Sequence, residues 1–167
     1  NKSGENIYRY NTFLRSRGTL TLRHGDDCIV EGNVFLGHGI SQTGAIRVIG
    51  AGHQIINNYI ERTMGRDGAA ITVYAGVPNS PLNEYFVADD TFIANNTIVD
   101  VSGPHIHVGA GFGSRDRTIL PSNVVVSNNL FIDTRNTNST ILVGENANEP
   151  MYVSNIASGI SIGSGVT

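Results

Sequence analysis

The sequence lacks tryptophan, has a single cysteine, Cys28, and contains no long apolar run. One cysteine excludes an intrachain disulfide. No segment approaches the roughly 20 apolar residues of a membrane-spanning helix, so no membrane partner is expected. The formal net charge is only −3, which excludes a global attraction for nucleic acid but leaves room for a local basic patch that binds a polyanion.

What the sequence does have is typical of strands and turns. It contains 20 glycines and many Val, Ile, Thr and Asn residues, which suit pleated surfaces and tight turns and predict an all-β fold. With 167 residues that are 40% hydrophobic, the chain is long enough for one domain with a sizeable core. It begins without Met and stops just after a strand-like stretch, so we expect residues 1–167 to be part of one longer domain whose N-terminal coils and C-terminal remainder are missing.

An internal repeat sets the expected fold. Six apolar segments each end in Asn followed by another apolar residue, and their asparagines are Asn11, Asn33, Asn58, Asn96, Asn129 and Asn155. A second strand series alternates with the first, at residues 18–25, 44–50, 69–76, 104–111, 139–145 and 159–165. Two strand series in fixed alternation predict stacked coils, and we expect a right-handed, single-stranded parallel β-helix of about six coils.

Alternation within the second series predicts inward aliphatic stacks. The inward pairs are Leu20/Leu22, Ile46/Val48, Ile71/Val73, Ile106/Val108, Ile141/Val143 and Ile160/Ile162. The segment at 18–25 is one residue longer between its glycines than the segment at 44–50, so a β-bulge is expected there. We interpret the recurrent Asn as an internal ladder at a turn with left-handed backbone, rather than as a ligand contact. Cys28 is interpreted as a small core residue rather than a nucleophile.

The outward positions of the second series form a polar stripe. It includes Thr19, Thr21, Arg23, Arg47, Thr72, Tyr74, His105 and His107. Counting back from Asn11 and Asn33 matches Lys2 with His24, which adds Lys2 to a basic cluster with Arg23, His24 and Arg47. Such a cluster suits an extended polyanion that presents a carboxylate at every sugar, and the alternative is a solvated face with scattered charge.

These residues carry a resemblance to a known family. Lys2-Ser3 with Glu5-Asn6, then TLTLRHG, VEGNVFLG, GAIRVIG, GHQIINNYIE and PNSPLNEYF, resemble the catalytic domain of polysaccharide lyase family 6, which contains alginate lyases and chondroitinase B-type dermatan sulfate lyases. The resemblance runs from Asn1 to about Asn129. GAIRVIG and NSPLN are more similar to the alginate-cleaving members.

The resemblance implies a calcium-assisted β-elimination that leaves a 4,5-unsaturated uronate, carried out by a secreted or periplasmic enzyme. Lys2 matches the base that removes the C5 proton, and Arg23 matches the group assigned as acid to the departing O4. His24 and Arg47 match substrate-binding positions near the carboxylate. The calcium ligands of the family lie on coils before the lysine, so we expect Ca²⁺ in the complete enzyme, no metal ligand in this chain, and an inactive isolated piece.

Physical chemistry supports these two catalytic roles unequally. Nearby arginines and Ca²⁺ would disfavour the charged form of Lys2, which makes it a credible base. Arg23 hardly releases a proton in a protein. Charge stabilisation by Arg23, with the proton arriving through water or His24, is therefore an equal contender.

Several alternatives stay open at the level of sequence. The substrate is expected to be alginate, and a lyase for dermatan or chondroitin sulfate would use loop arginines such as Arg62, Arg66, Arg115 and Arg117. A non-catalytic glycan-binding β-helix and a purely structural solenoid are the rival classes. His105 and His107 either bind metal or touch distal sugars. Tyr74 either contacts sugar or covers the sheet, and Asn83 and Glu84, after Pro81, would overhang a cleft.

Overall fold

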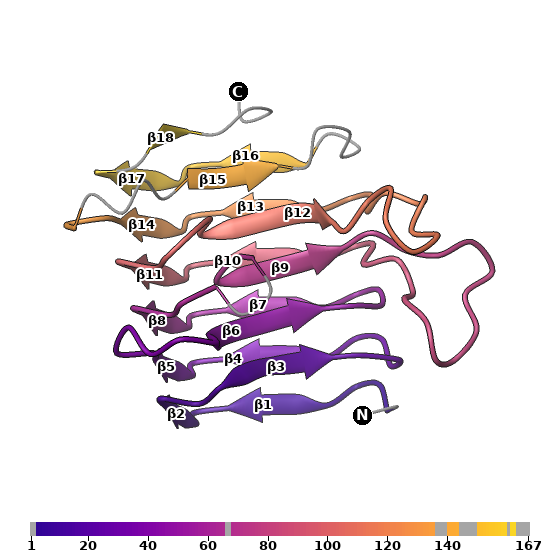
Figure 1. Cartoon of the computed structure of the whole chain (residues 1–167), viewed down its shortest axis with the longest axis horizontal. Coiled ribbons are helices and arrows are strands. Elements are labelled where there is room, and N and C mark those ends of the chain that lie inside the picture. The colour runs from indigo at the N-terminus through magenta and orange to yellow at the C-terminus, as the bar shows by residue number, and fades with distance from the viewer. Residues whose placement is uncertain (1–2, 66–67, 136–139, 144–149, 160, 163–167) are drawn as a thin grey trace.

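Each coil of the chain contributes one short strand to each of three parallel sheets (Figure 1). The computed structural model describes residues 3–65, 68–135, 140–143, 150–159 and 161–162. The coils stack into a right-handed parallel β-helix with six strands in each sheet, which confirms the predicted fold. Among the described residues, no helix is long and apolar enough to cross a membrane.

The strands follow one another in the same order in every coil. Sheet A contains β1 (Ile7–Arg9), β4 (Ile29–Glu31), β7 (Gln54–Ile56), β10 (Phe92–Ala94), β13 (Val125–Ser127) and β16 (Met151–Val153). Sheet B contains β2 (Thr12–Leu14), β5 (Val34–Leu36), β8 (Tyr59–Glu61), β11 (Thr97–Val99), β14 (Leu130–Ile132) and β17 (Ile156–Ser158). Sheet C contains β3 (Gly18–Leu22), β6 (Thr43–Val48), β9 (Ile71–Tyr74), β12 (Ile106–Ala110), β15 (Thr140–Val143) and β18 (Ser161–Ile162).

The sequence repeat indicated two strand series, whereas the structure has three. Each segment that was expected to be a single strand around its Asn is two strands in different sheets, such as β1 and β2 on either side of Asn11. The physical reason is a sharp turn at the residue before the Asn, where Tyr10 has a φ of 55°. Apolar residues on both sides of that turn still point into the core, so the pattern did not reveal the corner.

The predicted asparagine ladder is confirmed at all six positions. Asn58 illustrates the pattern: its side-chain oxygen accepts the backbone and side-chain N–H groups of Asn33, at 3.0 and 3.1 Å. Its side-chain nitrogen donates to the Val30 carbonyl and to Asn96 Oδ1, at 2.9 and 3.0 Å. Every described link repeats the amide-to-amide bond, from Asn11 to Asn155. The buried amides therefore satisfy each other and the turn backbone at once.

The left-handed backbone lies one residue before the ladder, not on it as we expected. The residues with positive φ at these corners are Tyr10, Gly32, Asn57, Asn95, Asn128 and Ser154. The first five direct their N–H to a carbonyl of the next coil, as Asn57 does to Ala94 at 3.1 Å. This division of roles frees the ladder side chain to point inward.

The inward aliphatic stacks are confirmed in register for the first four pairs. In the last coil Ile141 pairs with Ile162, and Ile160 lies outside the described residues. Leu20 pairs with Ile46, Ile46 with Ile71, and Ile71 with Ile106, and the second row runs from Leu22 through Val48 and Val73 to Val108. The register shifts between Gly18 and Leu20, but the extra residue lies on β6 and not in the 18–25 segment, where the glycine spacing had suggested it. Cys28 is buried in this core, as predicted.

His105 corrects one expectation, because it does not share the outward face with His107. Its side chain is fully buried and packs edge-on against Phe131, with ring centroids 5.6 Å apart. His105 precedes β12 by one residue, so strand alternation no longer fixes its direction. Burial lowers its pKa, and burial likewise lowers the pKa of His53, whose Nδ1 accepts the Cys28 backbone N–H at 3.1 Å.

We predict that Asn58→Ala lowers the free energy of unfolding by about 2–4 kcal/mol, because it leaves buried groups on two neighbouring coils without partners. Asn57→Gly is the matched control: it keeps the positive φ at the exposed neighbour and should change stability by less than about 0.5 kcal/mol. Urea unfolding followed by circular dichroism measures both. Equal losses in the two variants would contradict a specific role for the ladder.

We also predict that stability falls as the pH drops below about 6.5. The folded-state pKa values of His53 and His105 are lowered, so the unfolded chain binds protons that the folded chain refuses. The contribution of the two histidines to the free energy of unfolding is fully present above pH 6.5. It is lost as the pH falls toward their lower folded-state pKa values, by no more than about 1.4 kcal/mol per pH unit for each histidine. His53→Gln should flatten this slope in urea unfolding measured at successive pH values, and an unchanged slope would contradict the assignment.

Candidate active site

The candidate site lies where the strands of sheet C end, at the right of Figure 1. Arg23 follows β3 directly, Arg47 is in β6, and Tyr74 is the last residue of β9. Arg47 also stands in one row with Thr21, Thr72 and His107, which are paired on neighbouring strands about 4.8 Å apart. The predicted polar stripe is therefore confirmed for these four residues.

The long loop between β9 and β10 covers this end of the sheet (Figure 1). It is tied at its base, where Gly76 pairs with Ile119 in an antiparallel bridge and Val77 donates its N–H to the Tyr85 carbonyl at 2.8 Å. The loop thus returns toward earlier coils and carries Tyr85 to the arginines of β3 and β6.

Tyr85 is the centre of the cluster. The guanidinium carbons of Arg23, Arg47 and Arg117 lie 5.1, 5.2 and 4.8 Å from its ring centroid. Its hydroxyl accepts an N–H from Arg47, and the Tyr74 ring lies 5.2 Å away, tilted by 55°. Cation–π contacts of this kind hold guanidinium groups without neutralising them. Tyr74 is also 4.9 Å from the Arg47 guanidinium.

Arg23 is fixed from two sides. Its Nε donates to His24 Nε2 at 2.9 Å, and its Nη2 donates to the Asn83 carbonyl at 2.7 Å. The loop residues expected to overhang the cleft do so through their backbone, since the Glu84 carbonyl is 3.5 Å from the same Nη2. His24 is itself buried and packs edge-on against Phe86, with centroids 5.0 Å apart. His24 Nε2 is thus an acceptor toward Arg23.

Arg117 and Tyr85 are the residues that sequence reasoning did not assign to the site. Arg117 is only 8% exposed, and its Nε donates to the Gly111 carbonyl at 3.0 Å. Gly111 is needed for this approach, because a Cβ there would lie 2.6 Å from Arg117 Nε. In the sequence, Arg117 was one of several loop arginines and Tyr85 was part of the NEYF motif. Only the folding of two loops onto each other brings them together.

The site is strongly cationic. Within residues 3–65 and 68–135, neither Arg23 nor Arg117 makes an ion pair with a carboxylate. Three guanidinium groups around one phenol ring repel one another, and a bound anion would relieve that repulsion. Carboxylates suit the guanidinium fork, so the geometry favours an anionic ligand over a neutral one.

Other predicted residues fall outside this cluster or outside the described chain. Lys2 precedes the first described residue, so the structure says nothing of its position. His107 is partly buried, and burial lowers its pKa. The described residues contain no group of three or more His, Cys, Asp or Glu side chains that could hold a metal ion.

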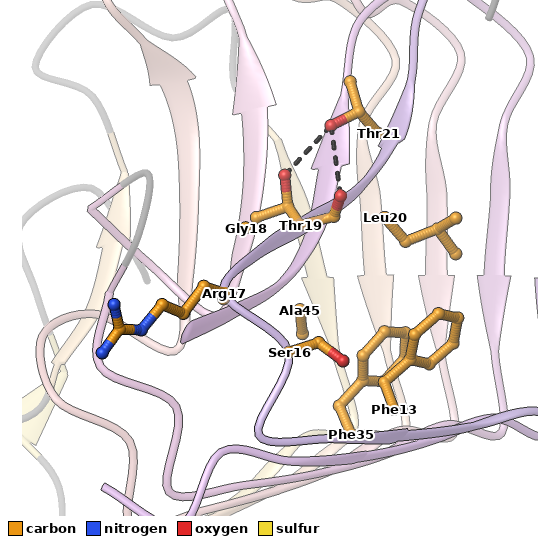
Figure 2. Close-up of a pocket in the computed structure, with 10 residues that line it drawn as sticks. Phe13, Ser16, Arg17, Gly18, Thr19, Leu20, Thr21, Phe35 and Ala45 are labelled. Carbon is orange, nitrogen blue, oxygen red and sulfur yellow. Dashed lines mark hydrogen bonds between the residues drawn. The ribbon is translucent and has the colours of Figure 1, made fainter. Parts of the chain in front are cut away.

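A hollow between the first two coils differs from the guanidinium cluster (Figure 2). Phe13 stacks on Phe35 beside it, at 4.6 Å and nearly parallel, while Thr19 and Thr21 share a hydrogen bond of 3.0 Å. Arg17 points away from the rings (Figure 2). This hollow lies at edge strands β2 and β3 and gathers no cluster of charges, so it is not the candidate active site.

The fold and this site define a parallel β-helix with a guanidinium-rich site at the end of one sheet. Among solved structures, the PL6 family alginate lyase AlyGC is 38% identical with a TM-score of 0.86, and the match covers 98% of this chain and 23% of that one. A mannuronic acid specific polysaccharide family 6 lyase from human gut microbiota is 29% identical with a TM-score of 0.70, covering 86% and 34% of the two chains.

The fold recurs in a PL6 alginate lyase solved with a trisaccharide, at 23% identity and a TM-score of 0.74, with 96% of this chain and 40% of that one covered. No curated protein sequence matches the chain. A family model described as Chondroitinase B matches residues 1–164. The chain belongs to this family, the polysaccharide lyase family 6 that its motifs resemble. It spans about a quarter of the length of AlyGC.

We predict that Tyr85→Leu weakens binding of an alginate oligosaccharide about tenfold, because three arginines lose the ring that spaces them. Tyr85→Phe keeps the ring, loses only the hydroxyl, and should weaken binding less than about threefold. Isothermal titration calorimetry measures both, with Tyr10→Leu on the exposed side of the first coil as the matched control. Equal affinities in all four proteins would contradict the role of Tyr85.

Proposed function

We propose that this chain is part of an alginate lyase that cleaves its acidic polysaccharide by β-elimination. The observation that carries the proposal is the cluster of Arg23, Arg47 and Arg117 around Tyr85, at the end of sheet C where the family resemblance expects the catalytic arginine. Two of the three arginines were expected at the substrate carboxylate or the leaving oxygen. The similarity to alginate lyases supports the substrate class.

In the proposed reaction Lys2 removes the proton from C5 of the uronate that follows the cleaved bond. The C5–H electron pair forms the C4=C5 double bond, the C4–O4 bond breaks, and O4 leaves with a proton. Lys2 is the one lysine in the sequence. Positive neighbours lower the pKa of a lysine, because they disfavour its charged form, and this makes an amine a usable base.

We propose that Arg23 stabilises developing negative charge instead of giving up a proton. A guanidinium hardly deprotonates in a protein, and the observed contacts hold it in a fixed direction: one N–H goes to His24 and another to the Asn83 carbonyl. Fixed donors cost no reorganisation when charge appears on the oxygen. Because His24 Nε2 already accepts from Arg23, His24 serves as an orienting residue, and water supplies the proton to O4.

Calcium and location remain proposals for the complete enzyme. We propose that Ca²⁺ supports activity through ligands outside the described residues, and that a chelator abolishes turnover until Ca²⁺ is restored. We also propose a secreted or periplasmic enzyme, since a long anionic polymer is met outside the cytoplasm. Cell fractionation tests the location, and turnover that ignores the chelator would remove calcium from the proposal.

A lyase for dermatan sulfate is the second candidate, because the matching family model is that of chondroitinase B. Of the arginines considered for sulfate, Arg117 belongs to the cluster and Arg115 lies in the same loop. Arg62 lies elsewhere, at the turn that follows β8. Arg117 could bind a uronate carboxylate as well as a sulfate group. Activity measured on alginate and on dermatan sulfate therefore decides between the two substrates.

We predict that the full-length protein raises the ultraviolet absorbance of alginate solutions, through the new C4=C5 double bond, and leaves dermatan sulfate unchanged. Lys2→Ala should lower kcat by about 10²–10⁴-fold, the usual contribution of a general base. Arg23→Lys keeps the charge but loses the fork and should lower kcat by about 10²-fold or more. Arg15→Lys is the matched control at an exposed turn and should keep full activity.

The outcomes separate the alternatives. Full activity of Lys2→Ala would remove the base assignment, and a rise on dermatan sulfate alone would move the substrate to the sulfated class. No rise on either polymer, with calcium present, would leave a glycan-binding or structural β-helix as the better description.

A further inference from the structure

A second group of cationic side chains lies at the opposite end of sheet C, in the turns that lead from sheet B to sheet C (left of Figure 1). These turns enclose a cavity of about 330 Å³, lined among others by His38, Arg62, Asp100 and Arg135. They belong to four consecutive coils, so the cavity extends about 14 Å along the axis at the usual strand spacing. Neither Arg23 nor Arg47 lines it.

Arg62 is held in the wall of this cavity. It follows β8 with a φ of 50°, its N–H donates to the Val99 carbonyl at 3.0 Å, and its carbonyl accepts from Gly39 at 2.8 Å. Its Nε is buried and has no hydrogen-bond partner among the described residues. A buried charged donor without an acceptor is costly, and an anion that bonds this guanidinium would offset that cost.

The charge balance of the cavity is positive. Neither Arg62 nor Arg135 makes an ion pair in the part of the chain that the structure describes. Among the described lining residues Asp100 is the one carboxylate, and it is already engaged by the Thr134 backbone N–H at 2.6 Å and hydroxyl at 2.9 Å. Two arginines therefore line the cavity against one carboxylate that is bonded elsewhere.

We propose that this cavity is an accessory binding site for the carboxylates of an acidic polysaccharide, separate from the candidate active site; the identity of the polymer rests on the proposed function. Arg62 follows β8 and Arg135 follows β14, two coils further, so their backbones are about 10 Å apart along the axis. A polymer that runs along the axis matches this spacing, whereas a small free anion occupies one position. A chain with a carboxylate on each sugar meets both arginines at once.

The test compares Arg62→Gln/Arg135→Gln with Arg15→Gln in the full-length protein. Arg15 is the matched control, because it follows β2 as Arg62 follows β8, with a φ of 51° against 50°. Calorimetric titration uses three probes, namely an alginate oligosaccharide, a neutral glucan of similar length and inorganic phosphate, in a background with Arg23→Gln that weakens the candidate active site. We expect the double variant to lose about tenfold in oligosaccharide affinity, while Arg15→Gln and the neutral glucan show no change.

Each outcome is decisive. Unchanged oligosaccharide binding in the double variant overturns the site, and a loss seen for phosphate alone overturns the polysaccharide as its ligand. Reduced turnover of a short oligosaccharide, with Arg23 intact, overturns its independence from the candidate active site. The double variant should bind the oligosaccharide more weakly whether or not the protein cleaves alginate. Failure of the lyase proposal shows separately, as no new absorbance when the full-length protein acts on alginate. Circular dichroism melting of the variants verifies that the coils are intact.

Discussion

The asparagine ladder is the interaction on which the rest of the structure depends. Each buried amide accepts two N–H groups from the coil on one side and donates to two carbonyls, as Asn58 does between Asn33 and Asn96. An amide without these partners would be costly to bury, so each rung requires the next at one strand spacing. The ladder thereby fixes where every coil turns from sheet A to sheet B, and with it the register of sheet C.

Fixed register leaves the loops free to differ. The longer insertions, after β9 and after β12, both leave sheet C at the end opposite to the turns from sheet B. They meet through the bridge between Gly76 and Ile119, and this contact is what brings Tyr85 and Arg117 together. Such a solenoid changes its site by changing loops, while its core rows stay the same.

The sequence predicted those features of the structure that depend on residues close together in the chain. The ladder and the rows from Leu20 and Leu22 were predicted because each depends on a short repeat along the chain. His105 was assigned to the wrong face because it stands one residue before its strand, where alternation does not apply. Tyr85 and Arg117 could not be assigned, since their meeting depends on two loops that are far apart in the sequence and carry no periodic pattern.

The electrostatics of the cluster connect the fold to the proposed chemistry. Arg23, Arg47 and Arg117 gather around Tyr85, where their mutual repulsion opposes the arrangement and only a rigid scaffold maintains it. An anion that binds there removes part of that repulsion, and a group whose negative charge grows during the reaction removes more. The same strain that makes the empty cluster unfavourable therefore stabilises a charged transition state more than the ground state, which is the condition for raising kcat rather than affinity alone.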